Sequence, residues 1–328
     1  MEPVLVVTGP TSSGKTALSI PLAQALEGEI ISMDSRQLYR GMDIGTDKVG
    51  AAECELVPHH GLDLVDPDEA FSAGRWAREA RGWIRAIRSR GRLPLLVGGT
   101  GFYLKALLEP IFREPPIDRG RRDRLRGWLD DQPLDELERW AARLDPDRAA
   151  VARDGGRQRL ARTLEVALLT GRPLSAWHRE SPPEAEPVRA RVVVLTLDRS
   201  ELYARIDARA GRMFERGLLD EVRGLLEAGF VPGDPGMTGT GYREAAAVLA
   251  GEITEAEALD RVQRVTRAYA RRQLTWFRGQ LGEVDLLEID AARPLGERVT
   301  QVLRWWRGSP GKGGGSSTSM DHSTPQLH

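Results

Sequence analysis

Residues 9 to 16 form a pattern that binds phosphate groups. The segment reads Gly9, Pro10, Thr11, Ser12, Ser13, Gly14, Lys15 and Thr16. It matches G-x-x-x-x-G-K-[ST] and lies between an apolar run at 4–8 and a helical pattern at 16–26, the context that this loop requires. Its N–H groups converge on phosphate oxygens, Lys15 supplies charge and Thr16 can coordinate Mg²⁺. We expect this loop to hold a phosphorylated substrate.

Two polar residues lie at the ends of predicted strands. Asp34 follows the β-rich run 29–33, and Thr100 follows the run 93–97. Parallel strands flanked by helices bind ligands beyond their carboxyl ends, so both residues are expected near the phosphate loop. From the residues alone, Asp34 could instead cap a helix that follows its strand, with Arg36 in solvent.

Strands that alternate with helices predict an α/β fold with a parallel sheet flanked by helices. Two double prolines, Pro115-Pro116 and Pro182-Pro183, bracket a stretch with helical periodicity and no strand pattern. We expect an all-helical insertion there, with the prolines as hinges, because proline interrupts regular structure. Helices are expected to cover the sheet from Glu201 onward. The expected organisation is a core at 1–114, the insertion at 115–183, the rest of the core at 184–307 and a disordered tail at 308–328.

Composition excludes several classes of protein. Hydrophobic residues make up 41% of the 328 residues, but no apolar run approaches the roughly 18 residues that a membrane span needs. The only cysteine, Cys54, rules out an internal disulfide and a cysteine-built zinc site, and the histidines are too scattered for a three-histidine metal centre. Any metal is therefore expected to be bound by oxygen. The N-terminus lacks the pattern of a signal peptide, so a cytoplasmic location is expected.

Arginine is concentrated in three segments, although the net charge is only −1. Five arginines lie between 119 and 126, three between 157 and 162, and six between 261 and 278 without an acidic residue. In the last segment a helix would place Arg264, Arg267, Arg271 and Arg278 on one side and Val262, Val265, Tyr269 and Trp276 on the other. One such group is usually a solvated face, but three together favour a polyanion as ligand. A further set, expected to be a solvated face, is Arg78, Arg81, Arg85 and Arg88.

The order of short motifs resembles that of the tRNA dimethylallyltransferases, also called tRNA isopentenyltransferases. The matching segments are GPTSSGKT (9–16), DSRQLY (34–39), GMDIGT (41–46), VPHH (57–60), DPDE (66–69), GGTG (98–101) with Tyr103 and Lys105, QRLAR (158–162) with Leu164-Glu165-Val166, GLLDEVR (217–223), GYR (241–243) and RQLTWFR (272–278). Their combination is highly specific. The chain departs from the family pattern at Asp47 and Glu244. It lacks the two-cysteine, two-histidine zinc finger of many eukaryotic relatives, so it resembles the short bacterial type.

This resemblance implies a P-loop NTPase-like fold and a prenyl transfer. The donor would be dimethylallyl diphosphate, and the acceptor would be the exocyclic amine of the adenine 3′ of the tRNA anticodon, with release of diphosphate. Asp34 would be the general base. Lys15, Arg223 and Mg²⁺ bound at Thr16 would neutralise the leaving group. Thr11 would contact the oxygen that joins the prenyl group to the diphosphate.

The resemblance also implies a set of tRNA-binding residues. Ser35, Arg36 and Gln37, with Asp34 and Thr100, would hold the target adenine, which must leave the base stack to be modified. The helical insertion would hold the anticodon stem. The residues implied along the RNA are Arg122, Gln158, Arg159, Leu160, Ala161, Arg162, Arg243, Arg271, Arg272 and Arg278. We expect a monomer without an obligate protein partner and without membrane contact.

Two other functions compete with this one. A small-molecule kinase of the P-loop type would need a second aspartate for magnesium. Asp198, after the run 192–197, could serve, although capping a helix that begins near Glu201 explains it better. A non-catalytic RNA-binding NTPase switch would use the same loop and arginines. Both alternatives need a nucleoside triphosphate, whereas a prenyltransferase prefers a prenyl diphosphate and does not hydrolyse ATP.

Overall fold

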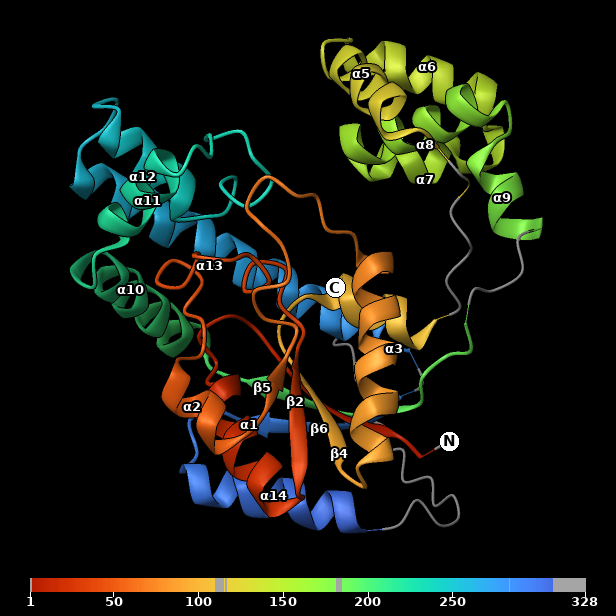
Figure 1. The fold of residues 1–328 in the computed structure, drawn as a ribbon. Helices are drawn as coiled ribbons and strands as arrows, with labels where there is room; N and C mark the ends of the chain where they lie inside the picture. The colour runs from red at the N-terminus through yellow and green to blue at the C-terminus, as the bar shows by residue number, and fades with distance from the viewer. Residues whose placement is uncertain (1, 110–114, 116, 181–184, 283, 309–328) are drawn as a thin grey trace, which may run out of the picture. The chain divides into compact units, whose positions relative to one another are not determined.

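The computed structural model describes residues 2–109, 115, 117–180, 185–282 and 284–308. They form two compact units (Figure 1). The core unit contains Leu5–Ala70, Arg85–Gly99 and the described chain from Arg191 onward. The helical unit contains residues 2–4, Phe71–Ile84 and the described part of Thr100–Ala190. The predicted tail beyond residue 308 lies outside the described residues, as do Pro116, Pro182 and Pro183, so the predicted hinges stay predictions.

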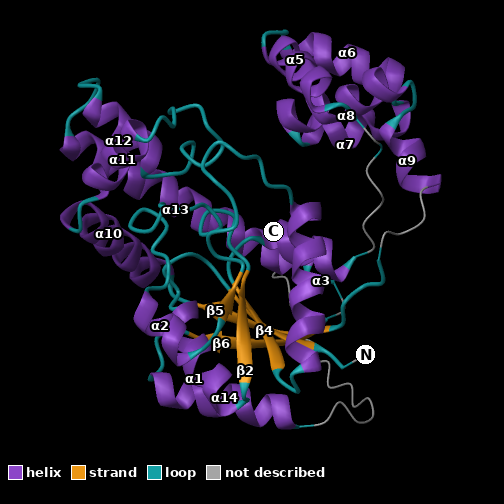
Figure 2. Cartoon of the chain, in the orientation of Figure 1, coloured by secondary structure: helices purple, strands orange, loops and turns teal. Residues whose placement is uncertain are grey.

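A six-stranded sheet forms the centre of the fold (Figure 2). Its strands are β1 (Val4–Thr8), β2 (Gly28–Ser32), β3 (His59–His60), β4 (Leu93–Val97), β5 (Ala190–Thr196) and β6 (Asp285–Asp290), in the order β3-β2-β4-β1-β5-β6. The pairs β1 with β4, β2 with β3, β2 with β4, and β5 with β6 are parallel. The predicted parallel sheet is therefore confirmed, and β1, β2 and β4 end where the phosphate loop, Asp34 and the GGTG segment begin.

Strands β3 and β6 differ from the sequence expectation. The prediction of helices alone after Glu201 is wrong for β6, which pairs with β5 at the sheet edge. Its sequence DLLEID buries Ile289 as its only fully covered residue. Because an edge strand needs little apolar surface, its pattern is too weak to recognise from sequence. Strand β3 is only two residues long.

Seven helices lie wholly in the core unit, in the part of the chain that the structure describes. They are α1 (Lys15–Ala25), α2 (Ala51–Leu56), α10 (Arg199–Glu215), α11 (Leu218–Glu227), α12 (Tyr242–Leu249), α13 (Glu255–Gln280) and α14 (Leu295–Arg307). Side chains of α1 and α14, such as Leu18, Leu22 and Val302, share one apolar core with the strands. The carboxylate of Asp198 accepts a hydrogen bond from the Ser200 N–H and caps α10, as predicted.

The helical unit contains two short stretches before and after β4 and a five-helix body. Helix α3 (Ala73–Ser89) begins in this unit, and α4 (Gly101–Leu108) lies within it. The body consists of α5 (Arg119–Asp130), α6 (Leu134–Leu144), α7 (Pro146–Asp154), α8 (Gly156–Thr170) and α9 (Leu174–Glu180). Its core contains Leu129, Leu137 and Leu164. The described residues of this stretch contain helices and no strand, in agreement with the predicted all-helical insertion. No helix of the described residues is long and apolar enough to cross a membrane.

Arg81 is an exception to the predicted solvated face of α3. Its side chain is buried and donates hydrogen bonds to the carbonyl oxygens of Ala106 at 3.4 Å and Leu107 at 3.1 Å, in the last turn of α4. The last carbonyls of a helix have no partner within the helix, so a buried cation there is stabilising. The prediction of a solvent role for this arginine is therefore wrong, although Arg78 and Arg85 are exposed.

A buried carboxylate stabilises the end of the sheet that lies away from the phosphate loop, where β2 begins. Glu29 on β2 is only 3% exposed. Its oxygens accept hydrogen bonds from Arg90 at 3.0 and 2.7 Å, and one oxygen lies 2.7 Å from His60 Nε2. The hydrogen bond from Arg90 is the main reason that the pKa of Glu29 lies below its usual value, and His60 adds to the effect.

We expect Glu29→Gln to lower the free energy of unfolding by about 2 kcal/mol at neutral pH, because it removes charge-assisted hydrogen bonds from a buried group. A lowered carboxyl pKa stabilises the folded state above the unfolded pKa, and that gain is lost as pH falls through the lower folded value. The wild type should therefore lose stability below about pH 4.5 more steeply than the variant. Urea unfolding across pH 3 to 7 measures this. Glu55→Gln, at an exposed position on α2, should match the wild type, and equal pH slopes for Glu29→Gln would contradict the assignment.

Candidate functional site

The phosphate loop adopts a conformation that requires its glycines. Gly9 has φ 143°, and a Cβ there would lie 2.7 Å from the carbonyl oxygen of Leu195. Gly14 has φ 84° and precedes the first turn of α1. The Lys15 ammonium donates hydrogen bonds to the carbonyl oxygens of Gly9 at 3.2 Å and Pro10 at 2.7 Å. The N-terminus of α1 thus faces the same space as a buried cation, an arrangement that attracts anions.

Burial lowers the pKa of Lys15 to about 8. Asp34 opposes this shift by attraction, and Arg209 adds to it by repulsion between two cations. An anion bound beside Lys15 would favour the charged ammonium and raise the pKa again. A bound phosphate group would therefore increase the proton affinity of Lys15.

Thr11 is held by hydrogen bonds to side chains of α10 and α13, two helices that come much later in the sequence. Its N–H donates to Gln273 Oε1 on α13 at 2.8 Å, and Gln273 Nε2 donates to the Gly99 carbonyl at 2.9 Å. Its hydroxyl oxygen accepts a hydrogen bond from Arg209 on α10 at 2.7 Å. Gln273 is only 7% exposed, so one buried amide joins the phosphate loop to the GGTG segment.

Two adjoining cavities lie beside this loop. The loop cavity has a volume of about 420 Å³, and its wall contains Thr11, Ser12, Gly14, Lys15, Thr16, Asp34, Gln37 and the arginines 205, 209 and 212 of α10. The central cavity has a volume of about 370 Å³. Five residues line both, namely Thr11, Asp34, Thr46, Arg209 and Tyr269. A molecule with phosphate groups in the loop cavity could therefore extend into the central cavity.

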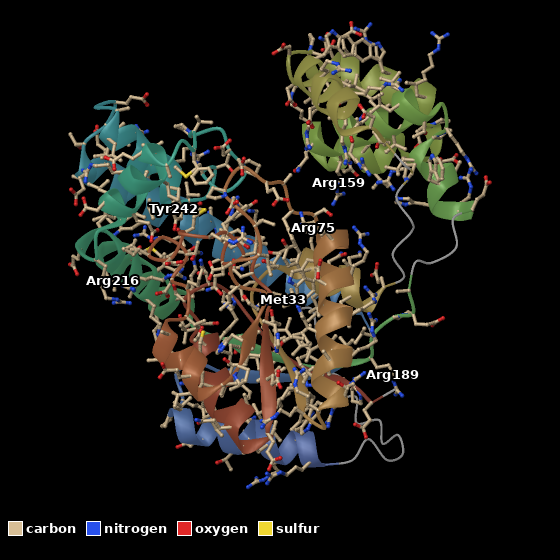
Figure 3. The ribbon with its side chains drawn as sticks, in the orientation of Figure 1. Met33, Arg75, Arg159, Arg189, Arg216 and Tyr242 are labelled. Carbon is tan, nitrogen blue, oxygen red and sulfur yellow. The ribbon has the colours of Figure 1, made fainter. Side chains whose placement is uncertain are left out.

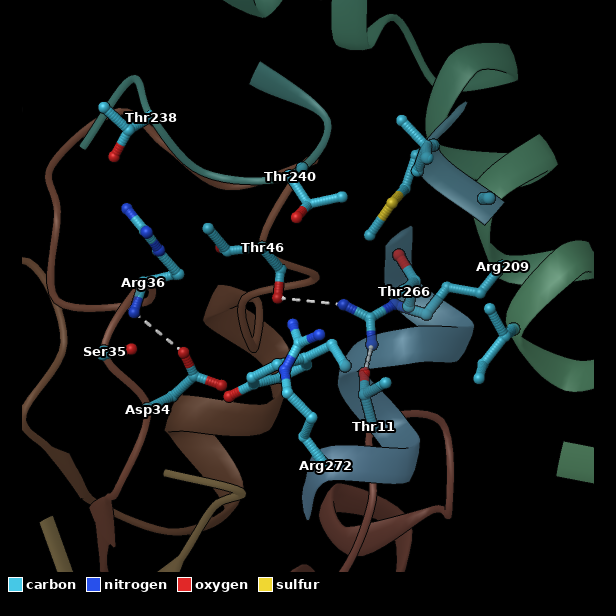
Figure 4. Close-up of a pocket in the computed structure, with 16 residues that line it drawn as sticks. Thr11, Asp34, Ser35, Arg36, Thr46, Arg209, Thr238, Thr240, Thr266 and Arg272 are labelled. Carbon is cyan, nitrogen blue, oxygen red and sulfur yellow. Dashed lines mark hydrogen bonds between the residues drawn. The ribbon is translucent and has the colours of Figure 1, made fainter. Parts of the chain in front are cut away.

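The central cavity has a polar wall made by loops and a mixed wall made by helices (Figure 4). Asp34, Ser35 and Arg36, with Thr46, Thr238 and Thr240, come from loops, and Figure 4 shows Thr238 and Thr240 above Asp34. The helical wall comes from α10 and α13, and it combines an apolar group, Ile206, Ala210, Met213 and Val262, with Arg209, Thr266, Tyr269 and Arg272. Such a cavity fits a ligand that is polar on one side and hydrocarbon on the other.

Asp34 lies at the boundary between the two cavities. It follows Met33, which lies in the core unit (Figure 3). The Met33 N–H donates to the Val97 carbonyl at 2.7 Å. Asp34 Oδ1 accepts a hydrogen bond from the Arg36 N–H at 2.8 Å, within a turn and not within a helix. Arg36 Nη1 donates to the Pro235 carbonyl at 2.8 Å. The alternative interpretation of Asp34 as the N-cap of a helix, with Arg36 in solvent, is therefore wrong.

Glu221 is a site residue that the sequence analysis did not single out. Its carboxylate accepts three successive backbone N–H groups, from Asp43 at 3.0 Å, Ile44 at 2.7 Å and Gly45 at 3.2 Å, and the Tyr242 hydroxyl at 2.5 Å. Burial is the main reason that the pKa of Tyr242 is raised. The GMDIGT, GLLDEVR and GYR segments thus meet at one carboxylate, which fixes the loop that brings Thr46 to both cavities.

Four of the predicted arginines in the core unit do not line either cavity. Arg223, Arg243, Arg271 and Arg278 lie on α11, α12 and α13, and all four are exposed. Arg223 is paired with Asp220, and Arg243 with Glu244. Around the loop cavity, the structure brings together Arg205, Arg209 and Arg212 instead. The proposed contact of Arg223 with a leaving group stays a prediction.

Helix α13 is less simply two-sided than its pattern suggested. Arg267, expected in solvent, is paired with Asp207 on α10 at 2.5 Å. Tyr269, expected in the core, is 39% exposed and lines both cavities. The prediction that four arginines form a solvent-facing stripe is therefore only partly correct. Arg272, which lies outside that stripe, lines the central cavity.

The helical unit contains the other predicted RNA-binding residues. Leu160 and Ala161 are buried in its core, so their side chains are not available for RNA. Gln158 and Arg159 are exposed (Figure 3). Arg162 and Arg122 both pair with the buried carboxylate of Glu165, Arg162 at 2.8 Å. Thr100, also in this unit, precedes α4 as its N-cap residue. A pair of arginines ordered by one carboxylate is suited to contact phosphate.

Magnesium fits this site only together with a phosphorylated ligand. Among the described residues no three histidine, cysteine, aspartate or glutamate side chains form a metal-binding group. Thr16 lines the loop cavity and offers one oxygen ligand. Mg²⁺ commonly binds one or two protein oxygens, several waters and substrate phosphates. The residues present agree with that mode of binding.

The chain is similar to known proteins over most of its length. The IPP transferase family matches residues 37–280. A tRNA dimethylallyltransferase of Roseiflexus sp. is 45% identical over 93% of this chain and 99% of the relative, and one of Geobacter sulfurreducens is 43% identical over 84% and 88%. A solved tRNA isopentenylpyrophosphate transferase of Bacillus halodurans is 35% identical, with a TM-score of 0.68, 94% of this chain and 96% of that chain covered. A eukaryotic dimethylallyltransferase acting on tRNA is 28% identical, with a TM-score of 0.77 and 92% and 78% covered.

We expect Gln273→Leu to weaken the binding of inorganic diphosphate about ten-fold, because the Thr11 N–H and the Gly99 carbonyl lose their shared partner and each costs about 1 kcal/mol or more when unsatisfied. Titration calorimetry measures the affinity, and thermal unfolding measures the accompanying loss of stability. Gln263→Leu makes the same change on α13 outside both cavities and should leave affinity unchanged. Equal affinity in the two variants would show that Gln273 does not position the loop.

Proposed function

The chain belongs to the IPP transferase family, and we infer that it acts as a tRNA dimethylallyltransferase through the two cavities that meet at Asp34. The observation that carries this proposal is the junction itself: a phosphate-binding loop and a hydrocarbon wall adjoin one carboxylate. Dimethylallyl diphosphate has one part for each of these: a diphosphate for the loop, an alkyl tail for the hydrocarbon wall and a reactive carbon beside the carboxylate. The acceptor is the exocyclic amine of the adenine 3′ of the tRNA anticodon, and the products are the prenylated tRNA and diphosphate. Because tRNA is the acceptor, the proposed location is the cytoplasm.

The loop cavity supports binding of the diphosphate. The N–H groups at the start of α1, Lys15 and Arg209 provide fixed positive charge where negative charge develops on the leaving group. Thr16 would hold Mg²⁺, which would supply a further positive charge against the diphosphate oxygens. Arg205 and Arg212 line the same cavity, so they are proposed as diphosphate contacts in addition to the predicted Arg223.

Thr11 is oriented for a contact with the bond that breaks. A hydroxyl has one O–H donor and two acceptor positions. Because the Thr11 oxygen accepts from Arg209, the remaining donor of the hydroxyl can point into the junction. We propose that it donates to the oxygen between the prenyl group and the diphosphate, which stabilises that oxygen as the carbon departs.

Asp34 is proposed as the base for the acceptor amine. The bond from the first prenyl carbon to oxygen breaks and its electron pair leaves with the diphosphate. The amine nitrogen forms the new bond to that carbon, and its proton passes to the Asp34 carboxylate. Ser35, Arg36 and the threonines of the polar wall offer hydrogen-bonding groups for the edge of an extruded base. Exposed Gln158 and Arg159, with Arg162, are proposed contacts of the anticodon stem.

The kinase alternative is not favoured. It depends on Asp198 as a second magnesium ligand, but that carboxylate caps α10 and is not part of the lining of the loop cavity. The exposed cationic surface of the helical unit would have no role in the transfer of phosphate to a small molecule.

Asp34→Asn should lower the rate of prenyl transfer by about 10² to 10⁴, because the amide cannot take the proton. Affinity for dimethylallyl diphosphate should remain close to normal. Unmodified tRNA is incubated with magnesium and the donor, and its mass is measured with time. The wild type should add one prenyl group, and Asp66→Asn, at an exposed position paired with Arg40, should behave in the same way. A wild type that leaves the tRNA mass unchanged refutes the function, whereas a normal rate for Asp34→Asn refutes only the role of the base.

Donor affinity should fall as pH rises through the pKa of Lys15, about 8. If the charged ammonium is required, the dissociation constant of dimethylallyl diphosphate should increase about eight-fold between pH 7.5 and pH 9, where the phosphate groups of the donor are already ionised. Calorimetry at each pH measures it. Lys15→Arg stays charged throughout this range and should show a flat profile, while Lys105→Arg should retain the wild-type slope. A flat wild-type profile would contradict the assignment.

A further inference from the structure

Helix α10 presents two adjacent faces to the two cavities. Residues 205, 208, 209 and 212 line the loop cavity, and residues 206, 209, 210 and 213 line the central cavity. Both sets follow the spacing that keeps residues on one side of a helix. The first face carries three arginines, the second carries Ile206, Ala210 and Met213, and Arg209 belongs to both. One helix therefore offers charge and hydrocarbon side by side.

The apolar face is completed by α13. Ile206, Ala210 and Met213 are only 1%, 3% and 7% exposed, and Val262 is 3% exposed. Val262 lines the same cavity, and α10 packs against α13. We name these four residues the alkyl slot. Their side chains offer no hydrogen-bonding groups, so the slot favours a hydrocarbon and disfavours a polar group that would lose its water.

We propose that the alkyl slot holds the tail of the donor, and that Ala210 and Met213 make the protein select a five-carbon tail against longer prenyl diphosphates. This inference rests on the function proposed above and adds the residues that determine the donor. The competing occupant is the target adenine. A base carries donors and acceptors around its edge, and the wall with Ser35, Arg36 and Thr240 offers partners for them, whereas the slot offers none.

The position of Met213 fits a limit on tail length. Arg209 binds the Thr11 hydroxyl oxygen at 2.7 Å, which fixes the level at which the tail leaves the diphosphate. Met213 lies one turn further along α10, about 6 Å away along the axis. The four-carbon main chain of a dimethylallyl group reaches roughly 4 Å, but the eight-carbon main chain of a geranyl group reaches roughly 9 Å. The shorter tail ends beside Ala210 and Met213, and the longer one would have to pass the methionine.

The reaction with a longer donor breaks and forms the same bonds. The bond between the first carbon and oxygen breaks, diphosphate leaves with the electron pair, the amine nitrogen bonds the carbon and Asp34 takes the proton. Only the tail differs between the two donors. A change of donor preference would therefore reflect contacts between the tail and the alkyl slot, and not a change in the chemical step.

The test compares dimethylallyl and geranyl diphosphate, alone and in competition, with unmodified tRNA and product masses as the readout. Met213→Ala should raise the ratio of geranyl to dimethylallyl transfer at least ten-fold, since discrimination by one methylene in an apolar pocket is about 10- to 200-fold. Ala210→Phe fills the slot and should raise KM for the dimethylallyl donor at least ten-fold. Neither variant should change the affinity for inorganic diphosphate, which binds outside the slot.

Leu225→Ala is the matched control for Met213→Ala. Leu225 on α11 is also 7% exposed and lines neither cavity, so its truncation should lower stability without changing donor preference. The inference is overturned if the wild type prenylates tRNA while Met213→Ala and Ala210→Phe keep the wild-type donor ratio and KM. If the wild type transfers neither group, the proposed function itself fails and the slot fails with it. Ala210→Leu provides a smaller insertion, with the same expected direction, if phenylalanine prevents folding.

Discussion

The site depends on the two hydrogen bonds that hold Thr11 between α10 and α13. A phosphate loop with a left-handed residue at Ser12 (φ 63°) is strained and needs its surroundings to fix it. Gln273 and Arg209 provide that constraint through the backbone N–H and the hydroxyl oxygen. Both partners lie about 200 residues or more after the loop, so the first half of the chain supplies the cradle and the second half sets its geometry. Each bond contributes only about 1 kcal/mol net, but together they determine where the hydroxyl donor points.

Charge explains why the two cavities take different parts of one ligand. Lys15, Arg209 and the N-terminus of α1 concentrate positive potential in the loop cavity. Burial is the main reason that the pKa of Lys15 is lowered, and repulsion from Arg209 adds to the effect. A bound diphosphate would favour the charged ammonium, because it attracts both cations. The helical side of the central cavity also carries Arg209 and Arg272, but beside them it offers the apolar side chains Ile206 and Val262. A prenyl diphosphate matches this gradient, whereas a nucleoside triphosphate would place ribose against hydrocarbon.

Several motif residues position the site and do not react. Glu221 gathers three N–H groups and the Tyr242 hydroxyl, and so holds the loop that carries Thr46. Glu165 does the equivalent for Arg122 and Arg162 in the helical unit. In both places one carboxylate with several donors fixes one arrangement, and Glu165 is buried, so that losing a partner there would leave a buried charge unsatisfied. This explains why segments without reactive residues belong to the pattern that identifies the family.

The sequence alone determined the phosphate loop, the parallel sheet, the helical insertion and the position of Asp34 at a strand end, because each depends on local patterns of glycine, apolar period and strand order. It could not identify the roles of Arg209 or Gln273, since one arginine among many and one glutamine on a helix rich in polar residues carry no local signal. It also misplaced Tyr269 and Arg267, because helical period assigns a side but not what packs against that side. Only the tertiary structure decided these, by bringing α10 and α13 against the loop, where a side chain's neighbours and not its spacing set its role.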